Sequence, residues 1–312
     1  MGNNMAFDLR QLKAFEAVAR HGGFSRASRE IGLTQPTLST HIRNLETSLG
    51  VRLFDRGTRT VNLTPTGALL ADYARKMLQL YEESLQAMEA FTGQIRGTIH
   101  VDASTVPGEY ILPRWLVDFH RRYTEVQVTL TVSDSAAVLG KVERGEAALG
   151  LTGSAGNDPA LENTLLCEDE VVLVATGPIS RDAGPVLDLA RLPGIPLIRR
   201  EHGSGTQLAI ETALGQHGID PESLNWVATL GSTRAVIEGA LAGLGGAFLS
   251  YSAVSREIAD GTLEEIPLGE MEIRRGLYVV YNRHRTLSPV ASCLLKELIQ
   301  SRHLFERKIK RS

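Results

Sequence analysis

Apolar residues recur every three or four positions over residues 9–21, and this spacing predicts an amphipathic helix. A second helix is expected from Phe24, and Gly32 suits the left-handed conformation that commonly ends a helix. Thr34 is a typical N-cap for a third helix. Residues 24–43 therefore have the two helices and the short break of a helix-turn-helix.

The third predicted helix has one apolar and one polar face. Leu38, Ile42 and Leu45 share the apolar side. The opposite side carries short or forked hydrogen-bonding side chains, which suit contacts with base edges and phosphates in a DNA major groove. An ordinary amphipathic surface helix would have the same pattern. The candidate DNA-contacting residues here are Ser25, Thr34, Gln35, Pro36, Thr37, Ser39, Thr40 and Arg43.

A small hairpin is predicted over residues 51–64, where apolar and polar residues alternate around a turn containing Gly57. Arg56 and Arg59 lie at its tip, where a wing would meet the phosphate backbone. These two arginines are therefore further candidate DNA contacts.

Residues 9–67 resemble the winged helix-turn-helix of the LysR-type transcriptional regulators. The matching residues are Leu9-Arg10-Gln11-Leu12, Phe15, Phe24-Ser25, Ala27, Gln35-Pro36, Leu38-Ser39, Ile42, Leu45-Glu46, Leu49-Gly50, Leu53-Phe54, Arg56, Leu63-Thr64 and Gly67. The resemblance implies a DNA-binding domain over 7–64, with promoter DNA and RNA polymerase as partners. Many relatives carry Arg where this chain has Thr40, so no base preference is carried over there.

A long helix is predicted over residues 65–92, which contain no Gly or Pro between Gly67 and Phe91. At about 1.5 Å per residue it would be about 40 Å long. Its apolar stripe consists of Ala74, Met77, Tyr81, Leu85 and Met88. The family resemblance implies that the same helix of a second subunit covers this stripe, in a homodimer or homotetramer. Packing against the chain's own body would satisfy it equally well.

Strands and helices alternate after residue 97, which is typical of parallel βαβ units. Two such sets are expected, joined by extended segments at 166–170 and 266–270. The resemblance implies a two-lobed α/β effector-binding domain over 98–312, like the periplasmic binding proteins. Its expected parts are lobe 1 at about 98–168 and 268–301, and lobe 2 at about 169–267.

Ligands of such sheets lie beyond the carboxyl ends of the strands, here between the lobes. Loops rich in Gly, Ser and Thr fall there, and their N–H groups suit a small carboxylate or inorganic oxyanion. Each loop alone is equally typical of a helix cap. The candidate effector-binding residues are Ser104, Thr105, Thr152, Gly153, Glu201, Gly203, Ser204, Gly205, Thr206, Ser232 and Thr233. The run 203–206 resembles family members that respond to small sulfur-containing anions.

The net charge of −3 is unevenly distributed. Residues 1–65 hold nine Lys or Arg and five Asp or Glu, so a basic unit precedes an acidic body. Neither a signal peptide nor a run of about twenty apolar residues is found, which predicts a cytoplasmic protein without a membrane partner.

Enzyme motifs are lacking: there is no Gly-x-Ser-x-Gly elbow, complete phosphate-binding loop or His-Glu-x-x-His pair. The two cysteines are expected to be reduced, and the eight histidines lack metal-ligand spacing. We therefore expect no catalytic residues, metal or cofactor. The alternative is a solute-binding or enzymatic α/β domain preceded by a protein-interaction module.

Overall fold

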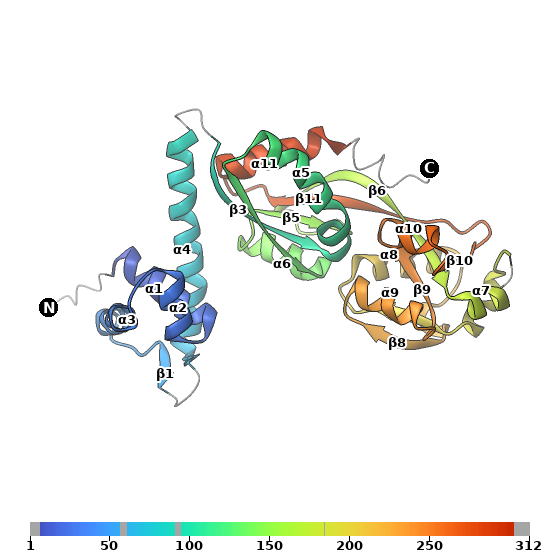
Figure 1. Cartoon of the computed structure of the whole chain (residues 1–312), viewed down its shortest axis with the longest axis horizontal. Coiled ribbons are helices and arrows are strands. Elements are labelled where there is room, and N and C mark those ends of the chain that lie inside the picture. Colours follow the sequence, from blue (N-terminus) through green and yellow to red (C-terminus); the bar gives the residue numbers. More distant parts are fainter. Residues whose placement is uncertain (1–6, 57–60, 91–94, 184, 303–312) are drawn as a thin grey trace. The chain divides into compact units, whose positions relative to one another are not determined.

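The computed structural model describes residues 7–56, 61–90, 95–183 and 185–302. The chain forms two compact units, Met1–Met88 and Glu89–Ser312, which are described separately (Figure 1). The expected combination of a helical amino-terminal domain, a long helix and a two-lobed α/β domain is confirmed.

Three helices form the core of the first unit: α1 (Leu9–His21), α2 (Phe24–Glu30) and α3 (Gln35–Leu49). Gly32 has φ +67°, and Thr34 Oγ1 accepts a hydrogen bond from the backbone N of Thr37 at 3.4 Å. The predicted stop and cap of the helix-turn-helix are therefore confirmed. Leu38, Ile42 and Leu45 are buried with α1, as the helical spacing predicted.

The wing is a hairpin of β1 (Phe54–Arg56) and β2 (Val61–Leu63). Glu46 on α3 accepts a hydrogen bond from the backbone N of Leu53 at 2.8 Å, which joins α3 to the wing. Gly67 lies so near this junction that a Cβ there would be 2.0 Å from the carbonyl oxygen of Leu53. A side chain is therefore excluded at residue 67 unless the wing moves.

The long helix α4 (Pro65–Ala90) divides its apolar residues between two environments. Ala74 is fully buried in the core of the first unit, whereas Leu85 and Met88 of the predicted stripe are 44% and 68% exposed. Lys13 on α1 contacts α4 through Glu82 (Nζ–Oε1 3.3 Å) and the ring of Tyr81 (5.0 Å). The predicted stripe is therefore satisfied within the unit only at its beginning.

The second unit is built on a continuous sheet with strand order β4-β3-β5-β11-β6-β9-β7-β8, and β10 pairs with β6. The strands are β3 (Gly97–Ser104), β4 (Val126–Ser133), β5 (Leu149–Thr152), β6 (Leu161–Ala175), β7 (Leu197–Arg200), β8 (Trp226–Leu230), β9 (Gly246–Ser250), β10 (Glu264–Glu265) and β11 (Ile273–Asn282). The α-helices are α5 (Leu112–Arg122), α6 (Ser135–Arg144), α7 (Gly177–Ala183), α8 (Gly205–Gln216), α9 (Thr233–Leu241), α10 (Tyr251–Ala259) and α11 (Pro289–Gln300).

Each lobe has helices on both faces of its part of the sheet. In lobe 1, α5 and α11 cover one face and α6 the other. In lobe 2, α8 covers one face, and α9 and α10 cover the other. A π-helical turn, η1 (Pro107–Ile111), precedes α5.

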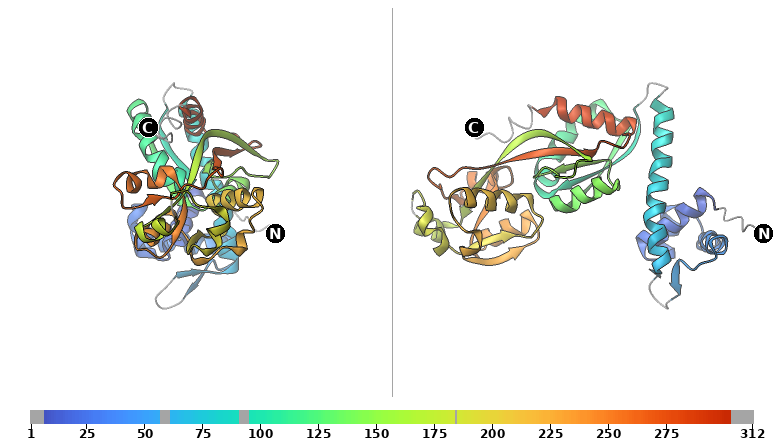
Figure 2. Two further views of the ribbon diagram at one scale, coloured as in Figure 1. Left: turned by 90° about the vertical axis from the view of Figure 1, so that its right-hand side faces the viewer. Right: turned by 180° about the vertical axis from the view of Figure 1, so that it is seen from behind.

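The lobes are joined by β6 and β11, which run side by side and pair antiparallel along their lengths (Figures 1 and 2). Leu268 and Met271 are buried in the core of lobe 2, so the chain returns to lobe 1 through β11. The prediction of a return at 266–270 was therefore wrong. The polar residues Arg274 and Arg275 had obscured the long strand that makes the crossing.

Candidate DNA-binding surface and effector cleft

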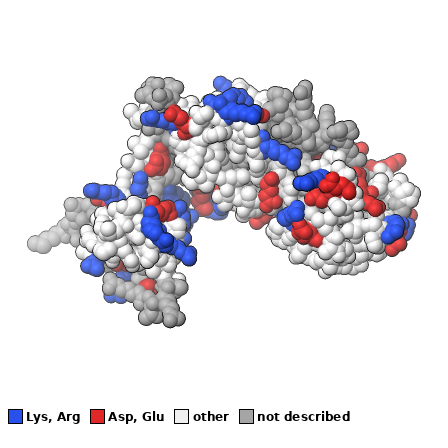
Figure 3. Space-filling model, viewed as in Figure 1, with Lys and Arg blue, Asp and Glu red and all other residues white. Residues whose placement is uncertain are grey.

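The polar face of α3 is accessible along its length. Gln35, Pro36, Thr37, Thr40 and Arg43 are exposed, and Ser39 is half-buried. Ser25 on α2 is also exposed. Basic side chains occur at several places on the visible face of this unit (Figure 3). A ligand can therefore reach the polar side of α3 and Ser25 of α2.

Hydrogen bonds separate the residues that shape α3 from those that are free to bind. The hydroxyls of Thr34 and Thr37 bond to each other at 2.8 Å, and Thr40 donates to the carbonyl oxygen of Pro36 at 3.0 Å. The side chains of Gln35 and Arg43 have no partner within the described part of the chain. These two side chains can therefore contact DNA without breaking an internal bond.

The wing arginines can be placed only in part. Arg56 ends β1, but its side chain lies outside what the structure describes. Arg59 lies wholly outside the described residues. Their expected phosphate contacts stay predictions.

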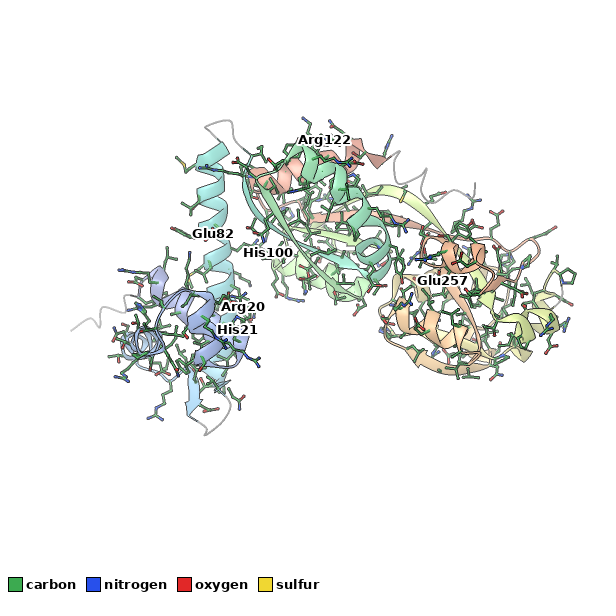
Figure 4. All side chains as sticks on the ribbon, viewed as in Figure 1. Arg20, His21, Glu82, His100, Arg122 and Glu257 are labelled. Carbon is green, nitrogen blue, oxygen red and sulfur yellow. The ribbon has the colours of Figure 1, made fainter. Side chains whose placement is uncertain are left out.

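Three polar side chains join the end of α1 to the end of α2. Arg20 and His21 both contact Glu30, and Figure 4 shows the first two next to each other. The hydrogen bond from His21, together with the charge of Arg20, holds the pKa of Glu30 below its usual value of 4.5. This contact links α1 to α2, which pack with α3 in one core.

One side of the effector cleft is a buried hydrogen-bonded group that spans the lobes. Thr105 of lobe 1 and Thr233 of lobe 2 share a hydrogen bond of 2.9 Å. Arg200 Nη1 donates to Thr233 at 2.7 Å and to Thr105 at 3.3 Å. Its other two nitrogens bind Glu201 at 2.6 and 2.8 Å. Glu201, expected to bind the effector, is therefore the counter-ion of Arg200.

On the other side of the cleft, backbone segments of the two lobes meet at glycines. A Cβ on Gly205 would lie 2.8 Å from the backbone carbonyl carbon of Gly153. The carbonyl oxygen of Gly203 accepts a hydrogen bond from the backbone N of Ala136 at 3.3 Å. The prediction that the loops at 153 and 203–206 lie close together is therefore confirmed.

The hydroxyls of the expected site differ in their availability. Ser204 and Ser232 cap α8 and α9, and Thr152 donates to the carbonyl oxygen of Ser154 at 2.8 Å. Ser104 and Thr206 are buried residues whose hydroxyls have no partner among the described residues. Of these five, Ser104 and Thr206 are therefore best suited to bind a ligand.

Sequence reasoning missed Ser133 at the end of β4. It pairs in register with Ser104, and its Oγ is buried without a partner in the described part of the chain. Such an orphaned hydroxyl is the exception in folded proteins and calls for a water or ligand. The alternating pattern of β4 gave no sign of it, because Ser133 follows the last apolar residue of the strand.

A cavity of about 410 Å³ lies nearby, between α8 and the ends of β7 and β8. Its main polar groups already have partners: Arg199 binds Glu222 at 3.0 Å, and Gln207 binds Glu211 at 3.0 Å. Two carboxylates in the lining disfavour an anion. This cavity is therefore a poorer candidate than the loops of the cleft.

No group of three or more metal-ligating side chains gathers within the described ranges. Nor is any helix in those ranges both long and apolar enough to span a membrane.

Comparison with family models gives two matches that together cover most of the chain. Residues 9–68 match "Bacterial regulatory helix-turn-helix protein, lysR family", and residues 92–302 match "LysR substrate binding domain". Among curated proteins, a "Probable RuBisCO transcriptional regulator" of Synechocystis sp. is 32% identical, over 95% of this chain and 87% of its own length. The "HTH-type transcriptional regulator CbbR" of Rhodospirillum rubrum is 31% identical, over 92% of this chain and 94% of its own.

Solved structures share the fold. The crystal structure of CbnR, a LysR family transcriptional regulator, has a TM-score of 0.72 at 20% identity and covers 98% of this chain and 100% of its own. The CcmR regulatory domain of Synechocystis PCC6803, in complex with 2-PG, has a TM-score of 0.59 at 24% identity and covers 66% of this chain and 97% of its own. These findings do not favour a solute-binding or enzymatic domain.

Proposed function

The chain belongs to the LysR family of DNA-binding transcriptional regulators with an effector-binding domain, and we propose that α3 reads promoter DNA under the control of a small anion. The exposed, unengaged side chains of Gln35 and Arg43 are the main support for α3 entering the major groove. Because the target is chromosomal DNA, we propose that the chain acts in the cytoplasm, with RNA polymerase as a further partner.

DNA binding is tested by titrating the full chain against the promoter region beside its own gene at several salt concentrations. Phosphate contacts predict a steep loss of affinity with salt, because binding releases counterions. Gln35→Ala should reduce the preference for that site over random DNA by about tenfold, corresponding to ~1–3 kcal/mol for a base contact. Thr47→Ala, on the exposed side near the end of α3, is the control and should leave the preference unchanged. If Gln35→Ala and Thr47→Ala show the same preference for the promoter site over random DNA, the assignment of α3 to the major groove is wrong.

The effector site is best supported by the free hydroxyls of Ser104 and Thr206, which lie at a strand end of lobe 1 and the first turn of a helix in lobe 2. Unpaired N–H groups at a helix N-terminus suit an anion. The printed ligand of the CcmR regulatory domain, 2-PG, makes phosphorylated acids the first class to test. The expectation of a sulfur-containing anion stays a prediction to be tested beside it.

Effector binding is measured by calorimetry on the full chain with 2-PG, inorganic phosphate and sulfate. The double variant Ser104→Ala/Thr206→Ala should weaken whichever anion binds, because two hydrogen bonds to a charged group are lost, at about 1.5–3 kcal/mol each. Unchanged affinity in the double variant would show that the effector binds at another site. Binding can alter transcription only by favouring one of two conformations, so the bound effector should also shift the footprint on DNA.

Self-association is proposed through α4. Leu80 and Met88 are large apolar side chains that remain exposed within the first unit, and a second copy of the helix would cover them. Whether two or four subunits assemble is a matter for sedimentation measurements on the full chain.

A further inference from the structure

A buried ion pair lies where the two connecting strands cross between the lobes. Asp169 on β6 and Arg275 on β11 are direct partners in the antiparallel register. Their side chains are 0% and 6% exposed. Arg275 donates from Nε at 3.0 Å and from Nη2 at 2.9 Å to Asp169 Oδ2. Ser250, at the end of β9, donates to the other carboxylate oxygen at 2.7 Å.

The third nitrogen of this guanidinium faces the effector loops. A Cβ placed on Gly153 would lie 2.6 Å from Arg275 Nη1, so the guanidinium packs directly against the turn that contacts Gly205. Nη1 has no hydrogen-bond partner among the described residues. Within the same residues, the fully buried side-chain atoms without a hydrogen-bond partner are the hydroxyls of Ser133 and Ser252. Nη1 of Arg275 is not one of them. Nη1 therefore reaches solvent-accessible space beside Gly153.

Arg200, the other arginine that is buried in the described chain, differs in this respect. All three of its nitrogens are engaged, by Glu201, Thr105 and Thr233. A guanidinium has five N–H groups in a fixed fork, and one carboxylate on one edge leaves the remaining nitrogen able to donate elsewhere. Arg275 is thus the buried cation with a free donor next to the effector loops.

We propose that Arg275 is the anion-binding residue on the floor of the cleft, donating from Nη1 to an oxygen of the effector while Asp169 serves as its counter-ion. This inference rests on the proposed function and adds a charged residue to that site. Because Asp169 and Arg275 lie on β6 and β11, the strands that connect the lobes, the negative charge of a bound effector lies beside this connection. Asp169 occupies Nε and Nη2 and leaves Nη1 to the effector, but its negative charge repels the anion and so limits how tightly the anion is held.

The attraction to Arg275 and the repulsion from Asp169 make opposite predictions for the two partners. Arg275→Lys keeps the charge next to Asp169 but loses the fork, so binding of 2-PG or inorganic phosphate should weaken about tenfold or more. Asp169→Asn removes the repelling negative charge and should tighten binding of the same probes about tenfold. Arg274→Gln is the matched control, because Arg274 is the exposed neighbour on the same strand and pairs with Glu272. Its affinity should equal that of the wild type.

Affinities are measured by calorimetry on the full chain, and folding is checked from the melting curve of each variant. If Arg275→Lys does not fold, Arg275→Gln/Asp169→Asn replaces it, since that pair leaves no unpaired buried charge. Equal weakening by Arg275→Lys and Asp169→Asn would show a merely structural pair and overturn the proposal.

Two further outcomes separate this inference from the proposed function. Unchanged binding in the Arg275 variants, together with weaker binding in Ser104→Ala/Thr206→Ala, would overturn the role of Arg275 and leave the effector site in place. Failure of the wild type to bind either probe would overturn both.

Discussion

Replacing Thr233 with Val should loosen the contact between the lobes while keeping the shape of the side chain. Thr233 is 1% exposed, and its hydroxyl bonds to Thr105 at 2.9 Å and accepts from Arg200 at 2.7 Å. Valine fills the same volume but bonds to neither. Arg200 then retains Glu201 and the longer contact with Thr105 at 3.3 Å.

The expected cost follows from the kinds of bond lost. The bond to Arg200 lies within lobe 2, so its loss does not by itself separate the lobes. The lost bond to Thr105 crosses the cleft, and a hydrogen bond between two neutral groups contributes about 0.5–1.5 kcal/mol. With about 1 kcal/mol less opposing separation of the lobes, the open form gains about fivefold in population.

The loosening is measured by hydrogen exchange with mass spectrometry on the full chain. Peptides that cover residues 103–108 and 231–236 should exchange faster in Thr233→Val, whereas the sheet interior should not change. Thr129→Val, at an exposed position on β4, is the control for the change of residue type. Wild-type exchange rates in both segments would refute the idea that this hydroxyl holds the lobes together.

Three further predictions concern the first unit. Gly67→Ala should destabilise it by about 1–3 kcal/mol, since the new Cβ would overlap the carbonyl oxygen of Leu53, and Ala68→Ser should have little effect in the same urea titration. Because the pKa of Glu30 is lowered, its contact with His21 should stabilise the unit above pH 4.5 and be lost as the pH falls below its depressed pKa; the melting temperatures of wild type and Glu30→Gln should therefore converge in acid. Leu80→Glu should lower the sedimentation coefficient by placing a charge on the exposed side of α4, and an unchanged oligomer would assign assembly to another surface.

Local patterns sufficed for the first unit because each of its elements carries its own start and stop. Gly32, Thr34 and the spacing of Leu38, Ile42 and Leu45 determine the helix-turn-helix through contacts between near neighbours. The strands and helices of the lobes were also largely predictable from alternating composition.

Long-range pairing was harder to predict. Asp169 and Arg275 are 106 residues apart in the chain, and each resembles an ordinary surface charge until β6 and β11 are placed side by side. The ion pair of Glu201 was unforeseen for a related reason: the sequence cannot show that its neighbour Arg200 turns inward and binds both of its oxygens.

The divided composition of lobe 1 has a consequence for the order in which a nascent chain folds. Its core needs Leu277 and Val279 of β11 and Leu294 and Leu298 of α11, which are synthesised after the first unit and most of lobe 2. The DNA-binding unit and most of lobe 2 are complete before then, and domains generally fold as they emerge. A chain that ends before residue 273 would therefore fold its DNA-binding unit but could not complete lobe 1, the lobe that contains Ser104.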